Sequence, residues 1–175
     1  MDTFFEQIIA IRKDAKAYLS LFGIWAAFLI IVGVLFVLAN MFTFFMSLMF
    51  LVIVFLGYLA FKLSKKFSIE YEYIITNGCF DVDKIIAKSS RKRMMSFDIS
   101  MVEALEKFNP NAIPNRVFKE KLFACNLDDP NAYYMIISEE GKGTKLLVFA
   151  PNERIQGAVK KYLPKYIANS AFKEL

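Results

Sequence analysis

The stretch IEYEYIITNGCFDVDKIIAKSSRKR, residues 69–93, predicts a β-hairpin that is followed at once by a cluster of positive charge. Residues 69–76 are rich in β-branched and aromatic side chains and alternate between two faces, as half-buried strands do. Asn77-Gly78 then supplies the two positive φ angles that a type I′ turn requires. Residues 79–86 form the return strand, with apolar and acidic residues alternating.

Turn signals recur after this hairpin at intervals that are typical of an antiparallel meander. A third strand is expected over residues 94–99 and a weaker element over 102–108, followed by a loop with two prolines. Further strands are expected at residues 121–127, 132–138 and 145–150. The period then changes, because apolar residues from Ile155 to Leu163 fall at helical spacing after a Pro151-Asn152 cap.

These elements predict an α+β fold in which an antiparallel β-barrel or sandwich of six or seven strands is capped by a C-terminal helix. That order resembles the pleckstrin-homology (PH) superfold. More closely, EYEYIITNGCFDVDKII followed by RKR resembles the start of PH-like domains in small bacterial membrane proteins, where two transmembrane helices precede a strand of the form Y-x-(I/L)-T-N/D-G. The resemblance covers nearly the whole chain and implies a fold and a location, but no activity.

One feature of lipid-binding PH domains is not carried over by this resemblance. Those that bind phosphoinositides use a long basic loop between their first two strands. Here that connection is expected to be only Asn77-Gly78.

Residues 17–61 contain no Asp, Glu, Lys or Arg and form a block far longer than the apolar core of a signal peptide. As one helix the block would be roughly 67 Å long, about twice the thickness of a bilayer core, so it must cross twice. Asn40 lies at its centre, which predicts a helical hairpin over 19–61 with spans at 19–39 and 41–61.

Small residues lie in pairs at equal distances from Asn40, and small residues let helices approach closely in lipid. Chance in a composition rich in small residues and a self-associating face are the alternatives to contact within the hairpin. The candidate contact residues are Ser20, Gly23, Gly33, Ser47, Gly57 and Ala60.

Lysines and arginines flank both spans, whereas the connecting turn carries no charge. Positive flanks stay in the cytoplasm, so a multi-pass protein of the cell membrane with both termini cytoplasmic is expected. Residues 1–18 are predicted to form an interfacial amphipathic helix, or else to extend the first span. Residues 62–68 would be a basic linker, and residues 69–175 the cytoplasmic PH-like domain.

The basic residues around the hairpin predict a collar that docks the domain on anionic lipid, each charge contributing on the order of 1 kcal/mol. The alternative is a solvated turn whose charges balance Asp81, Asp83 and other acids. The collar consists of Lys62, Lys65, Lys66, Lys88, Arg91, Lys92 and Arg93.

The composition argues against most catalytic and cofactor chemistry. The chain has no histidine, and Cys79 and Cys125 lack metal-ligand spacing, so both are expected to be buried core residues in a reducing compartment. Asp81 and Asp83 share a face without convergent partners. The net charge of +5 is spread over the chain, which argues against nucleic acid. No cofactor is expected.

Two functions fit these features. The first is a membrane-anchored, non-catalytic scaffold that presents a PH-like domain at the cytoplasmic surface to a protein partner, to a second copy of itself or to anionic lipid. The second is an accessory subunit of a membrane enzyme or transporter, bound through the transmembrane hairpin.

Overall fold

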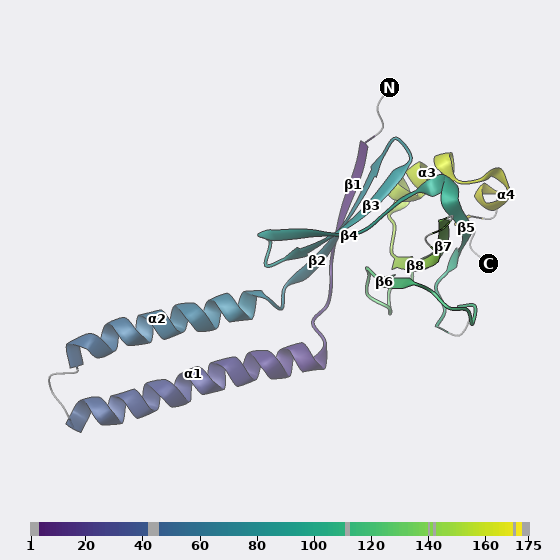
Figure 1. Ribbon diagram of the computed structural model, residues 1–175. Helices are drawn as coiled ribbons and strands as arrows, with labels where there is room; N and C mark the ends of the chain where they lie inside the picture. The colour runs from purple at the N-terminus through teal and green to yellow at the C-terminus, as the bar shows by residue number, and fades with distance from the viewer. Residues whose placement is uncertain are drawn as a thin grey trace. The chain divides into compact units, whose positions relative to one another are not determined.

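The computed structural model describes residues 4–41, 46–110, 113–139, 141, 143–169 and 171–172, apart from the side chains of 39–41 and 46–47. The chain forms two compact units (Figure 1). Arg12–Ile69 form a helical unit, and Met1–Ile11 together with Glu70–Leu175 form a β-rich unit. The helical unit is therefore inserted into the chain of the β-rich unit, not placed before it.

The helical unit is a pair of helices, α1 (Ala15–Met41) and α2 (Met46–Lys65). By length and composition, Ala15–Leu38 and Leu48–Lys65 are each able to cross a membrane. Their apolar side chains are exposed: Phe22 is 72% and Phe50 is 70% accessible. A helix that is apolar all round and not covered by protein suits a lipid environment.

The predicted spans are shifted relative to these helices. Asn40 lies inside α1, which continues through Met41, so the prediction that Asn40 forms the turn is wrong. Asparagine lowers helix propensity only slightly and does not end a helix by itself. The connection falls on residues 42–45, outside the described residues. α2 runs on to Lys65, so Lys62 and Lys65 belong to its last turn and not to a linker.

The predicted N-terminal helix is also wrong, because Phe4–Ala10 form strand β1. β1 pairs antiparallel with β2 (Ile69–Thr76), from Phe4 opposite Thr76 to Ala10 opposite Glu70. Seven residues with apolar side chains at several spacings fit both a helical and a strand period, and pairing with β2 decides between them. The other alternative, an extension of the first span, fails as well, since α1 begins only at Ala15.

The first sheet has the strand order β1-β2-β3-β4, with β3 at Cys79–Ile86 and β4 at Ser90–Asp98. Asn77 and Gly78 have φ angles of 50° and 90°, as a type I′ turn requires. This turn joins the second and third strands. The connection between the first and second strands is instead the whole helical hairpin.

A short 3-10 helix, η2 (Ile99–Met101), leads from β4 into the second sheet, whose strand order is β5-β7-β8-β6. Its strands are β5 (Val102–Lys107), β6 (Glu120–Phe123), β7 (Tyr133–Glu139) and β8 (Gly143–Phe149). β6 runs parallel to β8, so this sheet is not a pure antiparallel meander. The α+β fold is confirmed, with two four-stranded sheets in place of a closed barrel.

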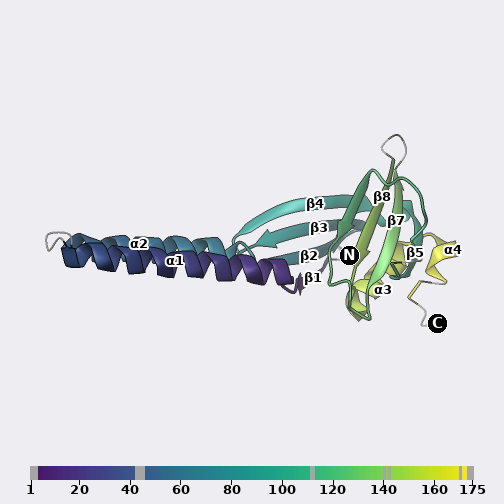
Figure 2. The ribbon, with the colours of Figure 1, turned by 90° about the horizontal axis from the view of Figure 1, so that it is seen from below.

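The core lies between these two sheets, and strands β3 and β4 run across β7 and β8 in Figure 2. Phe80 stacks on Phe97 at 5.4 Å between ring centroids and meets Phe149 of the second sheet edge to face at 5.7 Å. Tyr73 Oη donates to the carbonyl of Ala124 at 2.7 Å and accepts from the amide of Ala150 at 3.3 Å. This buried tyrosine therefore links the two sheets directly.

The predicted C-terminal helix is present as α3 (Glu153–Tyr162), followed by the short helix α4 (Lys165–Ala168). Asn152 caps α3 by accepting from the Ile155 amide at 2.9 Å, as the sequence predicts. The face with Ile155, Ala158 and Val159 is buried.

Candidate functional site

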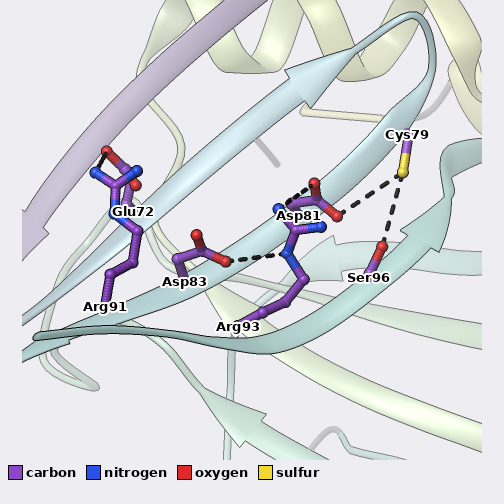
Figure 3. A network of polar contacts seen from close by, with 7 residues as sticks. All are labelled: Glu72, Cys79, Asp81, Asp83, Arg91, Arg93 and Ser96. Atoms are coloured by element: carbon purple, nitrogen blue, oxygen red, sulfur yellow. Dashed lines mark hydrogen bonds and ion pairs between the residues drawn. The ribbon is translucent and has the colours of Figure 1, made fainter.

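Charged side chains gather on the face of the first sheet that points away from the core. Strand alternation places Tyr73 and Ile75 toward the core and Glu72 on the opposite face. Figure 3 shows this outer face, where seven polar side chains from β2, β3 and β4 form a contact network. They are Glu72, Cys79, Asp81, Asp83, Arg91, Arg93 and Ser96.

Glu72 is the most deeply buried member of the network. Its side chain is 1% exposed, and Oε1 accepts a hydrogen bond from Arg91 Nη2 at 2.8 Å. The Arg91 side chain is 54% exposed and lies between the buried acid and solvent. Burying a carboxylate without a cation would be costly, so Arg91 is required for the charge on Glu72.

Arg93 neutralises the two aspartates of β3. Its guanidinium lies 3.0 Å from Asp81 Oδ2 and 3.3 Å from Asp83 Oδ1. The hydrogen bond to Asp83 and the charge of Asp81 raise the pKa of Arg93 above its usual value. A register shift between Val82 and Asp83 sets the pairing of Asp83 with Arg93. This pair of aspartates is therefore occupied by an arginine, and the described residues contain no group of three His, Cys, Asp or Glu suited to a metal ion.

The cluster of positive charge after the hairpin is divided between the two faces of the sheet. Arg91 and Arg93 lie on the outer face and pair with acids, as the alternative interpretation of a charge-balanced turn expects. Lys92 lies on the other face, directly opposite Lys84 of β3. Neither lysine forms an ion pair with the residues that the structure describes. Lys88 Nζ lies 3.9 Å from Glu70 Oε1, which makes a long ion pair, and the Lys88 side chain is 77% exposed.

The remaining collar residues belong to the helical unit. Lys62 lies over the Tyr58 ring and Lys65 over the Phe61 ring, with Nζ at 6.0 and 4.5 Å from the centroids. Lys66 follows directly after α2. Aromatic and basic residues at a helix end are typical of a membrane–water boundary.

The predicted contact residues of the hairpin are not brought together as pairs. A Cβ at Gly57 would lie 3.7 Å from the Phe28 ring, whereas Gly23 and Gly33 face open space. Ser20 is exposed and donates to the Lys16 carbonyl at 2.9 Å. Ala60 is buried, and the side chain of Ser47 lies outside the described residues. Gly23 therefore does not contact Gly57, whereas the predicted pairing of Gly33 with Ser47 involves a side chain that is not described.

The two cysteines differ, although the sequence predicted both to be buried. Cys125 is buried, and burial raises the pKa of its thiol to about 12. Cys79 is exposed on the outer face, with Sγ at 3.8 Å from both Asp81 Oδ1 and Ser96 Oγ. Strand alternation from Asp81 could have placed Cys79 on this charged face.

Two charged residues on these faces, Lys84 and Glu6, were not predicted from the sequence as site residues. Lys84 was overlooked although alternation along β3 separates it from Asp81 and Asp83. Glu6 was overlooked because its segment was taken for a helix. In β1, Glu6 lies opposite Ile74 and so shares the outer face with Glu72.

Two four-stranded sheets, a C-terminal helix and two helices long and apolar enough to cross a membrane are the elements expected of a PH-like domain joined to a helical hairpin. The chain belongs to the family described as Bacterial PH-like domain (DUF6106), whose model matches residues 1–169. The resemblance noted in the sequence is thereby confirmed, and the match includes β1 and the hairpin. Searches of curated proteins and of solved structures found no match.

Proposed function

We propose that this protein is a membrane-anchored, non-catalytic interaction module that holds a PH-like domain at the cytoplasmic surface. The observation that carries the proposal is the insertion of the hairpin between the paired strands β1 and β2. Two chain connections, one on each side of the hairpin, tether the domain to the membrane. A domain tied in this way is suited to presenting a fixed surface.

The orientation rests on the charges that flank the hairpin. Arg12, Lys13 and Lys16 surround the start of α1, and Lys62, Lys65 and Lys66 surround the end of α2. Residues 42–45 between the helices carry no charge. By the positive-inside rule, these charges favour a cytoplasmic location for both termini and for the PH-like domain.

The surface that we propose for anionic lipid consists of three lysines of the first sheet and of its β3–β4 turn, Lys84, Lys88 and Lys92. Arg91 and Arg93 of the predicted collar are left out of it because they pair with acids. Both chain connections leave this sheet at the end marked by Ala10 and Glu70. Because Asn77-Gly78 folds β3 back along β2, the turn between β3 and β4 lies at the same end. Lys84, Lys88 and Lys92 lie at or near this turn, and like charges at directly opposed positions such as Lys84 and Lys92 are destabilising without an anion.

A soluble form of the domain tests this lipid surface. A fragment beginning at residue 67 would lack β1, so we define the joined domain as residues 4–11 linked through Asn-Gly to residues 69–175. We expect it to float with anionic vesicles but not with neutral ones. Replacing Lys84, Lys88 and Lys92 by Gln should weaken binding about 100-fold, since each charge contributes on the order of 1 kcal/mol.

The matched control removes three exposed lysines elsewhere in the domain, Lys107, Lys119 and Lys160, with the same change in net charge. It should keep most of the affinity. Equal loss in both variants would mean that net charge alone attracts the domain to lipid. No binding to anionic vesicles by the joined domain would contradict the lipid surface.

A separate observation favours the second candidate function, an accessory subunit bound through the hairpin. Gly23 and Gly33 face open space, so another helix could approach α1 closely there. This function does not require the joined domain to bind lipid. A negative flotation result therefore favours it over lipid docking.

A further inference from the structure

The two carboxylate oxygens of Glu72 have different surroundings. Oε1 accepts from Arg91 Nη2 at 2.8 Å. Oε2 is fully buried, and no donor reaches it from the residues that the structure describes. A buried carboxylate oxygen without a donor costs on the order of 1–3 kcal/mol, so this atom calls for an explanation.

Glu6 of β1 offers an explanation for the missing donor at Glu72 Oε2. Ile8 lies opposite Glu72 and Glu6 opposite Ile74, so Glu6 and Glu72 are diagonal neighbours on the same face. Burial, and next the neighbouring carboxyl group of Glu6, raise the pKa of Glu72, against the lowering effect of Arg91. Two ionised carboxylates contain no hydrogen to donate, which is why Oε2 lacks a donor. One proton between them would supply it.

We propose that Glu6 and Glu72 share a proton, which closes a carboxyl–carboxylate hydrogen bond and fastens β1 to β2. The other charged groups around Glu72 are Asp83 from β3, which opposes its ionisation, and Arg91 from β4, which favours it. Arg91 is already bound to Oε1, and no second cation among the described residues forms an ion pair with Glu72. Loss of the proton leaves two carboxylates in repulsion across the β1–β2 pair.

The consequence follows from the place of β1 in the fold. β1 is an edge strand that pairs with one strand only, β2, and four residues separate it from α1. The shared proton therefore controls how firmly one of the two membrane connections is attached to the domain. The attachment of β1 to β2, and with it the N-terminal connection to the membrane, therefore depends on this proton.

The direction of the pH effect is fixed by linkage. The pKa of Glu72 is raised in the folded state, so the folded form binds the proton more tightly than the open form. The stabilisation is fully present below the ordinary glutamate pKa, near 4.3, and is lost as the pH rises through the folded value. Glu103, whose pKa is lowered by the hydrogen bond from Arg116, acts in the opposite direction, so the readout must be local to β1.

Hydrogen exchange of the full chain in detergent micelles provides this local readout. Protection factors of the β1 amides, corrected for intrinsic exchange, are compared from pH 4 to 8. In the wild type we expect them to fall, by up to tenfold per pH unit, as the pH rises from the ordinary glutamate pKa through the raised pKa of Glu72, and to level off above that value. In Glu6→Gln the side-chain amide donates to Oε2 at every pH, so the slope should vanish. Glu153→Gln, which removes an exposed carboxylate of α3, should keep it.

A flat wild-type profile would overturn the proposal, as would an unchanged slope in Glu6→Gln. Infrared spectroscopy of the wild type gives a second test that needs no stable variant. A protonated carboxyl band that persists above the usual glutamate range supports the shared proton, and absence of that band overturns it. The proposed lipid surface is independent of both results, because Lys84, Lys88 and Lys92 have no described contact with Glu6 or Glu72.

Discussion

Removing β1 from the joined domain is expected to destabilise it by about 3–5 kcal/mol, although residues 69–175 contain all the strands from β2 to β8. Gln7 donates from Nε2 to the Ala150 carbonyl at 3.0 Å and accepts at Oε1 from the Asn152 amide at 2.8 Å. Phe5 and Ile9 are partly buried on the same face. Two side-chain hydrogen bonds, this burial and the ladder to β2 together account for the expected loss.

Urea unfolding followed by far-ultraviolet circular dichroism measures this difference, and the only tryptophan, Trp25, lies in α1 and is absent from both proteins. The joined domain should unfold cooperatively, whereas residues 69–175 alone should unfold at much lower urea or not cooperatively. Equal midpoints would contradict the assignment of β1 to this domain.

Arg91→Ala is expected to destabilise the joined domain by about 2 kcal/mol, because it leaves the buried charge of Glu72 without its cation. The value is below the range for fully buried pairs, since the exposed side of Arg91 lets water approach. The adjacent Lys92→Ala is the matched control. Lys92 is exposed on the other face without an ion pair to the described residues, so its loss should change stability by less than about 0.5 kcal/mol.

The free energy of unfolding of both variants comes from urea titration at pH 7. At acidic pH the effect of Arg91→Ala should shrink, because a protonated Glu72 no longer needs the cation. If Lys92→Ala and Arg91→Ala were equally stable at pH 7, the Arg91–Glu72 pair would have no structural importance.

The hairpin at Asn77-Gly78, the C-terminal helix and the helical pair were predictable because each depends on local signals. A two-residue turn, a helical cap and a long charge-free block can all be recognised within a short window of sequence. β1 could not be recognised in that way. Its partner strand lies about 60 residues further along the chain, and only that pairing distinguishes a strand from a helix at Phe4–Ala10.

The residue types of the candidate site could be predicted from the sequence, but the pairs that they form could not. The basic cluster was visible as RKR, yet which of its members pair with acids depends on strand faces and on the register shift at Val82 and Asp83. Alternation could have separated Lys92 from Arg91 and Arg93. The position of Glu72 diagonal to Glu6 depends on the pairing of β1 with β2, so it could not be predicted once residues 4–10 were assigned to a helix.

The hairpin is proposed to hold this domain on the cytoplasmic side of the membrane. Cys79 is exposed and Cys125 is buried, so one native thiol reports on the location of the domain. A membrane-impermeant maleimide should label the wild type in inside-out vesicles but not in intact spheroplasts, and Cys79→Ser should not be labelled in either without denaturant. Labelling of Cys79 in intact spheroplasts would place the domain outside the cytoplasm and contradict the account.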